Sequence, residues 1–199
     1  MAMSGNWDFG AAFKFGFTAL KKHWVFLLVV EVLFIIAEFC SGGASSLSSP
    51  ILAEWCGILM IPHCIEMYEP GRRSAKMGHW RSWWATTFYS LVGFSGLLLC
   101  IVGVFLSGPL SSYAMAYYAE HREQGLFGAL KAIWRRIFSD GQWKILLYFF
   151  VLDILISGLM DLFTLGALTP VVMYITAAWD AAVYCQAFPR ASTQPTAAA

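Results

Sequence analysis

The sequence has few charged residues: Asp, Glu, Lys and Arg make up 13% of its 199 positions, about half their share in an average soluble domain. Hydrophobic residues make up 59%. A water-soluble domain of this size leaves much of its surface exposed, so it could not hide that much apolar surface. A lipid bilayer can accommodate it. The composition therefore predicts an integral membrane protein.

Several marks of other protein classes are also missing. The net charge is only +1, whereas a nucleic-acid-binding domain needs a concentrated basic face. The five cysteines are scattered, form no C-x-x-C pair, and lie mostly in apolar runs, where cysteine acts as a small hydrophobic residue. Neither a glycine-rich phosphate loop nor an acidic metal-binding motif is present. We expect no disulfide framework, no metal or other cofactor, and no nucleic-acid partner.

Six apolar stretches run along the chain. A membrane-spanning helix needs about 20 residues, with about 17 as the lower end. Five of the stretches reach this length, whereas the fourth is short and begins after a Gly-Pro break, so it forms a half-helix or takes residues from its flanks. The stretches are Trp24–Cys40, Ile51–Tyr68, Ser82–Leu106, Pro109–Ala119, Trp143–Leu165 and Thr169–Phe188.

The distribution of basic residues tests this division independently. Every lysine and arginine lies at the N-terminus, between the second and third stretches, between the fourth and fifth, or after the sixth. The remaining connections, Ser41–Pro50, Ser107–Gly108 and Gly166–Leu168, carry no charge. With six spans, all basic segments fall on one side of the membrane, as the positive-inside rule requires. We therefore predict a multipass protein of the inner (plasma) membrane with both termini in the cytoplasm.

The chain also divides into three similar units, at about residues 5–68, 72–119 and 122–188. Each unit begins with a basic, aromatic segment and continues with two spans. Amphipathic helices of this kind lie in the membrane interface, with their cations near anionic headgroups. The cations expected to contact lipid are Lys14, Lys21, Lys22, Arg72, Arg73, Lys131, Arg135 and Arg136.

These patterns predict one all-α domain over residues 1–188. Its fold class is a polytopic transmembrane bundle of about six helices, arranged as three parallel hairpins with basic interfacial helices. Residues 189–199 are expected to form a disordered tail.

Acidic residues inside the predicted spans are the most informative feature. A central aspartate costs about 2.5–3.5 kcal/mol on insertion scales, so such residues normally face the bundle interior or a cavity. Glu31 and Asp153 lie nearest to the middle of the membrane, at comparable positions in the first and third units, and Glu54 and Asp180 are further candidates. These acids form a path for protons or cations, or hydrogen-bond neighbouring helices in protonated form, or bind a partner. Glu38, Glu54 and Asp161 lie near the outer ends of the spans, and Glu66 lies near an inner end.

Signals of catalysis are weak. Gly93-Phe94-Ser95-Gly96 resembles the G-x-S-G nucleophile motif of rhomboid intramembrane proteases, but that family's base is a histidine in its last core helix, where Thr169–Phe188 has none. A serine without a base is a poor nucleophile, and small residues at this spacing more often allow close helix packing. A metal site could be assembled from His63, Cys64 and Glu66, with Met60 and Met67 nearby. Only His63 and Glu66 are paired on one helical face, and a single such pair offers too few ligands for a closed site. We therefore expect no enzymatic activity, and intramembrane hydrolysis is the third hypothesis.

The third unit has a familiar sequence pattern. It runs from Arg122-Glu123-Gln124-Gly125 through an amphipathic segment to Thr169-Pro170 and an aromatic-rich helix ending near Tyr184. With the opening Phe13–Trp24 segment, it resembles uncharacterised bacterial six-helix membrane proteins, a class that includes the membrane domain of some glycerophosphodiester phosphodiesterases. The resemblance implies a six-helix fold. It does not imply phosphodiesterase activity, because the chain carries no phosphodiesterase domain.

Two functional hypotheses lead. The first is a non-enzymatic accessory or scaffold protein that binds another membrane protein, a second copy of itself or anionic lipid through its amphipathic helices. The alternative is a small proton- or cation-coupled transporter or channel that uses Glu31 and Asp153.

Overall fold

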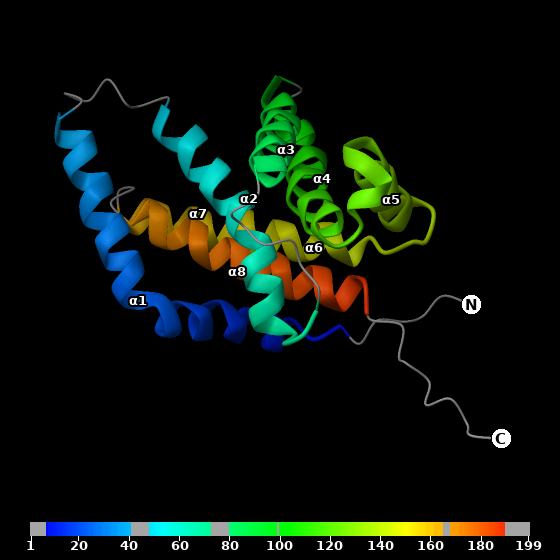
Figure 1. The fold of residues 1–199 in the computed structure, drawn as a ribbon, viewed down its shortest axis with the longest axis horizontal. Helices are drawn as coiled ribbons and strands as arrows, with labels where there is room; N and C mark the ends of the chain where they lie inside the picture. Colours follow the sequence, from blue (N-terminus) through cyan, green and yellow to red (C-terminus); the bar gives the residue numbers. More distant parts are fainter. Residues whose placement is uncertain (1–6, 41–47, 73–79, 99, 165–167, 190–199) are drawn as a thin grey trace.

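The computed structural model describes residues 7–40, 48–72, 80–98, 100–164 and 168–189, and within these ranges it contains helices and no strands. This confirms the predicted all-α class. The elements are α1 (Phe9–Cys40), α2 (Ser48–Tyr68), α3 (Trp80–Leu98), α4 (Cys100–Glu120), η1 (Arg122–Gln124), α5 (Gly125–Phe138), α6 (Lys144–Phe149), η2 (Phe150–Ile156), α7 (Ser157–Thr164) and α8 (Thr169–Ala187) (Figure 1).

Helix α8 forms the centre of the protein. Every side chain from Tyr174 to Ala187 is buried, and α1, α2, α4 and the α6–η2–α7 segment all pack against this helix. Trp179 is fully buried: its indole N–H donates to the Phe13 carbonyl at 3.1 Å, and its ring stacks on the Phe13 ring at 5.8 Å between centroids. The first half of α1 is thereby fixed to the core helix.

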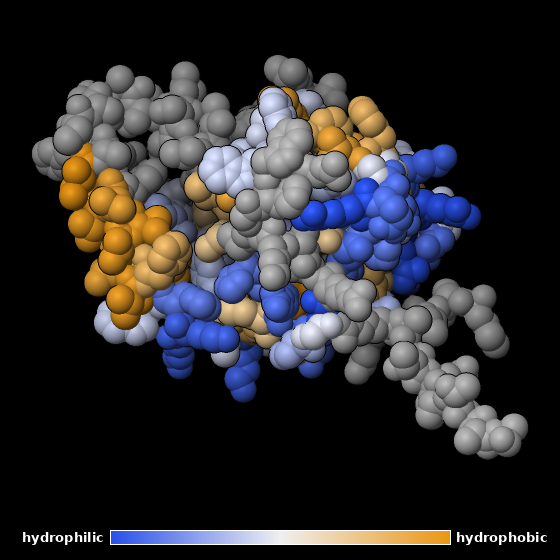
Figure 2. All heavy atoms as spheres, viewed as in Figure 1, coloured by the Kyte–Doolittle hydropathy of each residue, from blue (hydrophilic) through white to orange (hydrophobic). Residues whose placement is uncertain are grey.

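Helix α1 bends at His23, whose φ of −118° and ψ of 17° are not helical. The half before the bend carries the three exposed lysines, Lys14, Lys21 and Lys22. The half after it exposes apolar side chains from Trp24 to Ile36, several of them 50–60% exposed. They form the hydrophobic patch at the left of Figure 2, above hydrophilic surface. Contiguous apolar surface of this kind marks contact with a membrane or another protein.

Helices α3 and α4 correct one sequence-based boundary. The Gly108-Pro109 pair predicted a turn there and a short fourth stretch, but α4 runs unbroken from Cys100 to Glu120 with Pro109 inside it. Proline removes one backbone donor from a helix, and membrane helices tolerate this where neighbouring groups compensate. Ser107, which was predicted to lie in the turn, lies within α4, and its hydroxyl donates to the Gly93 carbonyl of α3 at 2.9 Å. The fourth helix is therefore as long as a full span.

One continuous helical segment among the described residues, Lys144–Thr164, is long and apolar enough to cross a membrane. It consists of α6, η2 and α7, and little of it is buried within the protein. Leu162 and Phe163 are 66% and 83% exposed near its end. Its middle part, Phe150–Ile156, is a π-helix, a wider helix that is rare in proteins and is frequently found at functional sites.

Candidate functional site

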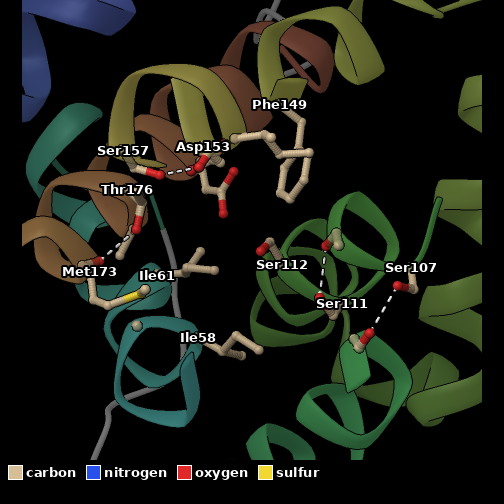
Figure 3. Close-up of a pocket in the computed structure, with 16 residues that line it drawn as sticks. Ile58, Ile61, Ser107, Ser111, Ser112, Phe149, Asp153, Ser157, Met173 and Thr176 are labelled. Carbon is tan, nitrogen blue, oxygen red and sulfur yellow. Dashed lines mark hydrogen bonds between the residues drawn. The ribbon is translucent and has the colours of Figure 1, made fainter. Parts of the chain in front are cut away.

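A cavity of about 380 Å³ lies between α2, α4, the α6–η2–α7 segment and α8 (Figure 3). Its apolar wall includes Ile58 and Ile61 of α2 and Phe149 of α6. Its polar lining consists of Ser107, Ser111, Ser112, Asp153, Ser157, Thr176 and Asp180. Hydroxyl and carboxyl groups from four elements therefore converge on one space in the interior.

Two aspartates meet in this cavity. Asp153, on the π-helix, points toward the centre of the cavity in Figure 3, with the Ser112 side chain on the facing helix. Its carboxyl group interacts with that of Asp180 from α8, and Ser112 and Tyr113 of α4 also interact with Asp180. Asp180 is 4% exposed and Tyr113 is 1% exposed. The site thus joins the carboxyl groups of η2 and α8, which are close in the sequence, with hydroxyl groups of α4.

The hydrogen bonding of this pair is incomplete. One buried oxygen of each carboxyl group, Oδ1 of Asp153 and Oδ1 of Asp180, lacks a well-formed hydrogen bond, as does the Tyr113 hydroxyl. Buried polar groups are normally paired, so unpaired ones indicate a ligand, a water molecule or a proton-exchange role. Two bare carboxylates side by side repel each other, and a shared proton or a bound cation relieves that repulsion.

The local backbone accounts for the position of Asp153. The π-helix over Phe150–Ile156 adds a residue to the turn and changes which side chains face the core. The Ser157 hydroxyl donates to the Asp153 carbonyl one turn later. The segment around these residues is apolar and largely exposed, so Asp153 is an isolated carboxyl group on its inward face.

Two other acids of the predicted spans, Glu31 and Asp161, are not among the residues that line the cavity. Glu31 is buried at 4% exposure, and its carboxyl lies beside the Val171 backbone in the first turn of α8, without a well-formed hydrogen bond. Asp161 accepts a hydrogen bond from the Thr169 hydroxyl at 3.4 Å, at the first residue of α8. Negative groups near a helix N-terminus interact favourably with its dipole. The structure therefore pairs Asp153 with Asp180 and not with Glu31. The side chain of Glu54 lies outside the described residues.

A second polar cluster surrounds Arg72 and gives this residue a structural role in place of the expected lipid contact. Arg72 is 6% exposed and donates to both carboxylate oxygens of Glu120, to Glu69 at 2.9 Å and to the Phe188 carbonyl at 2.7 Å. The Tyr184 hydroxyl also donates to Glu120, at 2.6 Å. Burial by itself lowers the pKa of Arg72, but hydrogen bonding to the Glu120 carboxylate raises it above its ordinary value. The guanidinium is held charged in the interior.

Most of the remaining predicted lipid-contacting cations are exposed. They are Lys14, Lys21, Lys22, Lys131 and Arg135. Arg136 differs, because its guanidinium donates to the Ala187 carbonyl at 2.7 and 3.2 Å and to Asp140 at 3.2 Å. Like Arg72, it therefore satisfies carbonyl groups at the C-terminal end of α8, where cations are favourable. Arg73 lies outside the described residues.

The glycine-serine motif serves helix packing in this structure. A Cβ atom on Gly96 would lie 1.9 Å from Ser107 Oγ and 2.7 Å from the Gly103 carbonyl oxygen. Ser95 is exposed and donates to the Val92 carbonyl of its own helix at 2.7 Å. Glycine at position 96 thus allows α3 and α4 to approach closely, which was the more common interpretation of the motif.

The sequence pointed to both aspartates but not to the hydroxyl groups around them. Ser107, Ser111 and Ser112 share α4 with the misplaced turn, and dividing the helix at Pro109 separated Ser107 from the other two. The spacing of Ser107 and Ser111, four residues apart, puts them on one helical face once α4 is read as continuous. That spacing was the available signal.

Comparisons of the chain with protein-family models, with curated proteins and with solved structures gave no match. The resemblance to bacterial six-helix membrane proteins stays a prediction. The geometry of the site is therefore the basis for a functional proposal.

Proposed function

We propose that the chain is a multipass membrane protein that binds a proton or small cation between Asp153 and Asp180 and transfers it as a small transporter or channel. The observation that carries this proposal is the carboxyl pair itself. Ionisable groups within membrane segments are expensive, and they typically mark ion and proton pathways. Here two of them face each other in a cavity lined with hydroxyl groups, and each has an unpaired oxygen.

The exposed apolar surfaces support a membrane setting. The second half of α1 and the Lys144–Thr164 segment both expose large apolar side chains, such as Leu33 at 60% and Phe163 at 83%. In water these surfaces would be unfavourable at about 25 cal/mol per Å². In lipid the same surfaces contact acyl chains at no such cost.

Hydrogen bonds among the C-terminal ends of α2, α4 and α8 support the proposal of three parallel hairpins. Arg72 follows α2, Glu120 is the last residue of α4, and Phe188 follows α8, and Arg72 hydrogen-bonds both of the others. These are the second helices of the three predicted units, so parallel hairpins require their ends to meet. We propose that this cluster lies on the cytoplasmic side of the inner membrane, near both termini, as the positive-inside rule indicates.

Ion flux through proteoliposomes tests the proposal. The full chain is reconstituted, and proton movement is followed with an internal pH-sensitive dye under a K⁺ diffusion potential, with Na⁺ and K⁺ uptake measured in parallel. We expect flux of one of these ions, and about a tenfold or greater loss in Asp153→Asn and Asp180→Asn, since each removes one ionisable partner. Asp161→Asn is the matched control and should retain flux. Absence of flux in the wild type, or equal flux in all variants, would overturn the proposal.

The accessory role remains a second candidate because of helix α5. Its inner face packs on the core through Ala129, Ile133 and Ile137. Its outer surface exposes Phe127 at 75% and Trp134 at 50%, next to the exposed cations Lys131 and Arg135. A mixed aromatic and basic surface suits anionic lipid.

Mass spectrometry of protein purified from native membranes in mild detergent tests this role. A stoichiometric anionic lipid or protein partner is expected on the wild type. It should be absent from the Phe127→Ser, Trp134→Ser, Lys131→Ser variant. If nothing co-purifies with the wild type, the accessory role loses its support.

A further inference from the structure

Another cluster of potential ligands lies where α1 bends against the second half of α2. His23 stands at the bend, and its Nε2 is 3.2 Å from Sδ of Met67. The His23 ring is 5.5 Å, between centroids, from the ring of His63, at an interplanar angle of 72°. His63 and Met67 are four residues apart and therefore share one face of α2. Two imidazoles and a thioether thus converge from two helices.

The spacing of these groups suits a shared metal ion. Two imidazoles bound at about 2.0 Å to one metal have ring centroids roughly 5–6 Å apart, which matches the separation of His23 and His63. A thioether beside one imidazole nitrogen completes a three-coordinate set. All three side chains are partly exposed, so an ion can reach them.

The ligand types select the metal. Among the described residues, no group of three or more His, Cys, Asp or Glu is arranged to hold a metal. The group beside the two imidazoles is the Met67 thioether, 3.2 Å from His23 Nε2. Hard cations such as Mg²⁺ and Ca²⁺ take oxygen ligands, and structural Zn²⁺ sites are almost always four-coordinate. Thioether ligands select Cu(I), which imidazole also suits.

We infer that His23, His63 and Met67 form a copper(I)-binding site at the bend of α1. The site is separate from the carboxyl pair, because none of its three residues lines the cavity. Its neighbours fit this assignment. The Tyr174 ring of α8 lies 6.0 Å from His23 and closes one side with an aromatic wall, while Cys64 is fully buried next to the site.

The bend in α1 contributes to the site. His23 is the residue at which the backbone leaves helical geometry, so its imidazole is set at the junction of the two halves of α1. A bound ion would fix the angle between the basic half and the apolar half.

Anaerobic competition titration of the tag-free full-length protein in detergent, with bicinchoninate as the Cu(I) probe, tests the inference. We expect one Cu(I) per chain, with X-ray absorption showing two nitrogen ligands and one sulfur ligand. Met67→Leu keeps the side-chain volume and should fold normally. It should remove the sulfur ligand from the X-ray absorption signal. It should also weaken Cu(I) binding by more than about tenfold, the lower end of the roughly 10–100-fold loss that follows removal of an outer-shell partner.

His121→Gln is the matched control. His121 stacks on Tyr117 at 4.3 Å and is not one of the three proposed ligands, so this variant should bind Cu(I) like the wild type. The inference is overturned if wild-type affinity equals that of the triple variant His23→Gln, His63→Gln, Met67→Leu. It is also overturned if Met67→Leu binds Cu(I) with unchanged affinity and an unchanged X-ray absorption spectrum. Circular dichroism of each variant verifies that the helices are intact.

Discussion

Replacing Arg72 with alanine should destabilise the protein severely. The guanidinium is 5% exposed as a side chain and bonds Glu120, which is itself 9% exposed. It also supplies the hydrogen bond of the Phe188 carbonyl, at 2.7 Å. Alanine would remove all these contacts at once and leave the Glu120 carboxylate buried without its cation.

The size of this destabilisation depends on which partners of Arg72 are left without a hydrogen bond or an opposite charge. Removing one member of a buried ion pair costs about 3–5 kcal/mol, mostly from the charge that stays behind. The lost hydrogen bond to the Phe188 carbonyl adds about 1 kcal/mol, and the Tyr184 hydroxyl, which stays bonded to Glu120, offsets a similar amount. The contact with Glu69, which is 31% exposed, contributes little because water screens it. We expect a net loss of about 3–5 kcal/mol.

Reversible unfolding of the full-length protein in mixed detergent micelles, followed by circular dichroism as the SDS fraction rises, measures this loss. Lys131→Ala removes an exposed cation and should change the free energy of unfolding by no more than about 0.5 kcal/mol. Adding Glu120→Gln to Arg72→Ala should recover part of the loss, because the stranded charge is then gone. A loss below about 1 kcal/mol for Arg72→Ala, or a double variant in which the two losses simply add, would refute the reasoning.

Two further predictions concern packing and the N-terminal segment. Gly96→Ala should lower the free energy of unfolding by about 1–3 kcal/mol, because the new Cβ atom would overlap Ser107 Oγ. Gly158→Ala is the control and should be neutral or stabilising, since a Cβ atom there would have nothing within 4 Å. The same SDS titration compares the two variants, and equal effects would contradict this packing. Gln186→Ala should increase amide hydrogen exchange at Asp8 without a comparable change in α3. The reason is that the Gln186 side chain accepts from the Asp8 N–H at 3.0 Å and donates to the Asp8 carbonyl at 2.9 Å. Unchanged exchange at Asp8 would show that these bonds do not hold the residues before α1 in place.

The helices and the acids were predictable because each rests on local composition. Apolar runs of about 20 residues have few alternatives to helix, and isolated acids such as Asp153 and Asp180 stand out within them. The break between the third and fourth helices was misplaced for a local reason as well. Pro109 is a strong breaker signal in a soluble helix, but α4 continues through it, and the close contact at Gly96 that joins the two helices is not visible in a hydropathy pattern.

The partners of the polar groups were not predictable, because they depend on how distant segments meet. Arg72 looked like one of several basic residues in a loop, and only the convergence of the ends of α2, α4 and α8 buries it. The same holds for Met67 and His23, which are separated by 44 residues and meet because α1 bends beside α2. Spacing within one helix suggested His63 with Glu66, but Glu66 is exposed.

The position of α8 explains why the polar contacts gather along it. A helix surrounded by other helices presents no surface to lipid, so it can carry Asp180 and Gln186 if neighbours supply partners. The Lys144–Thr164 segment faces outward over much of its surface, and its one central acid therefore has to turn inward, toward α8. The π-helical turn at Asp153 provides that orientation. A sequence change that restored a regular α-helix there would shift Asp153 away from Asp180, so the proposed ion site rests on the backbone of η2 as much as on the two carboxyl groups.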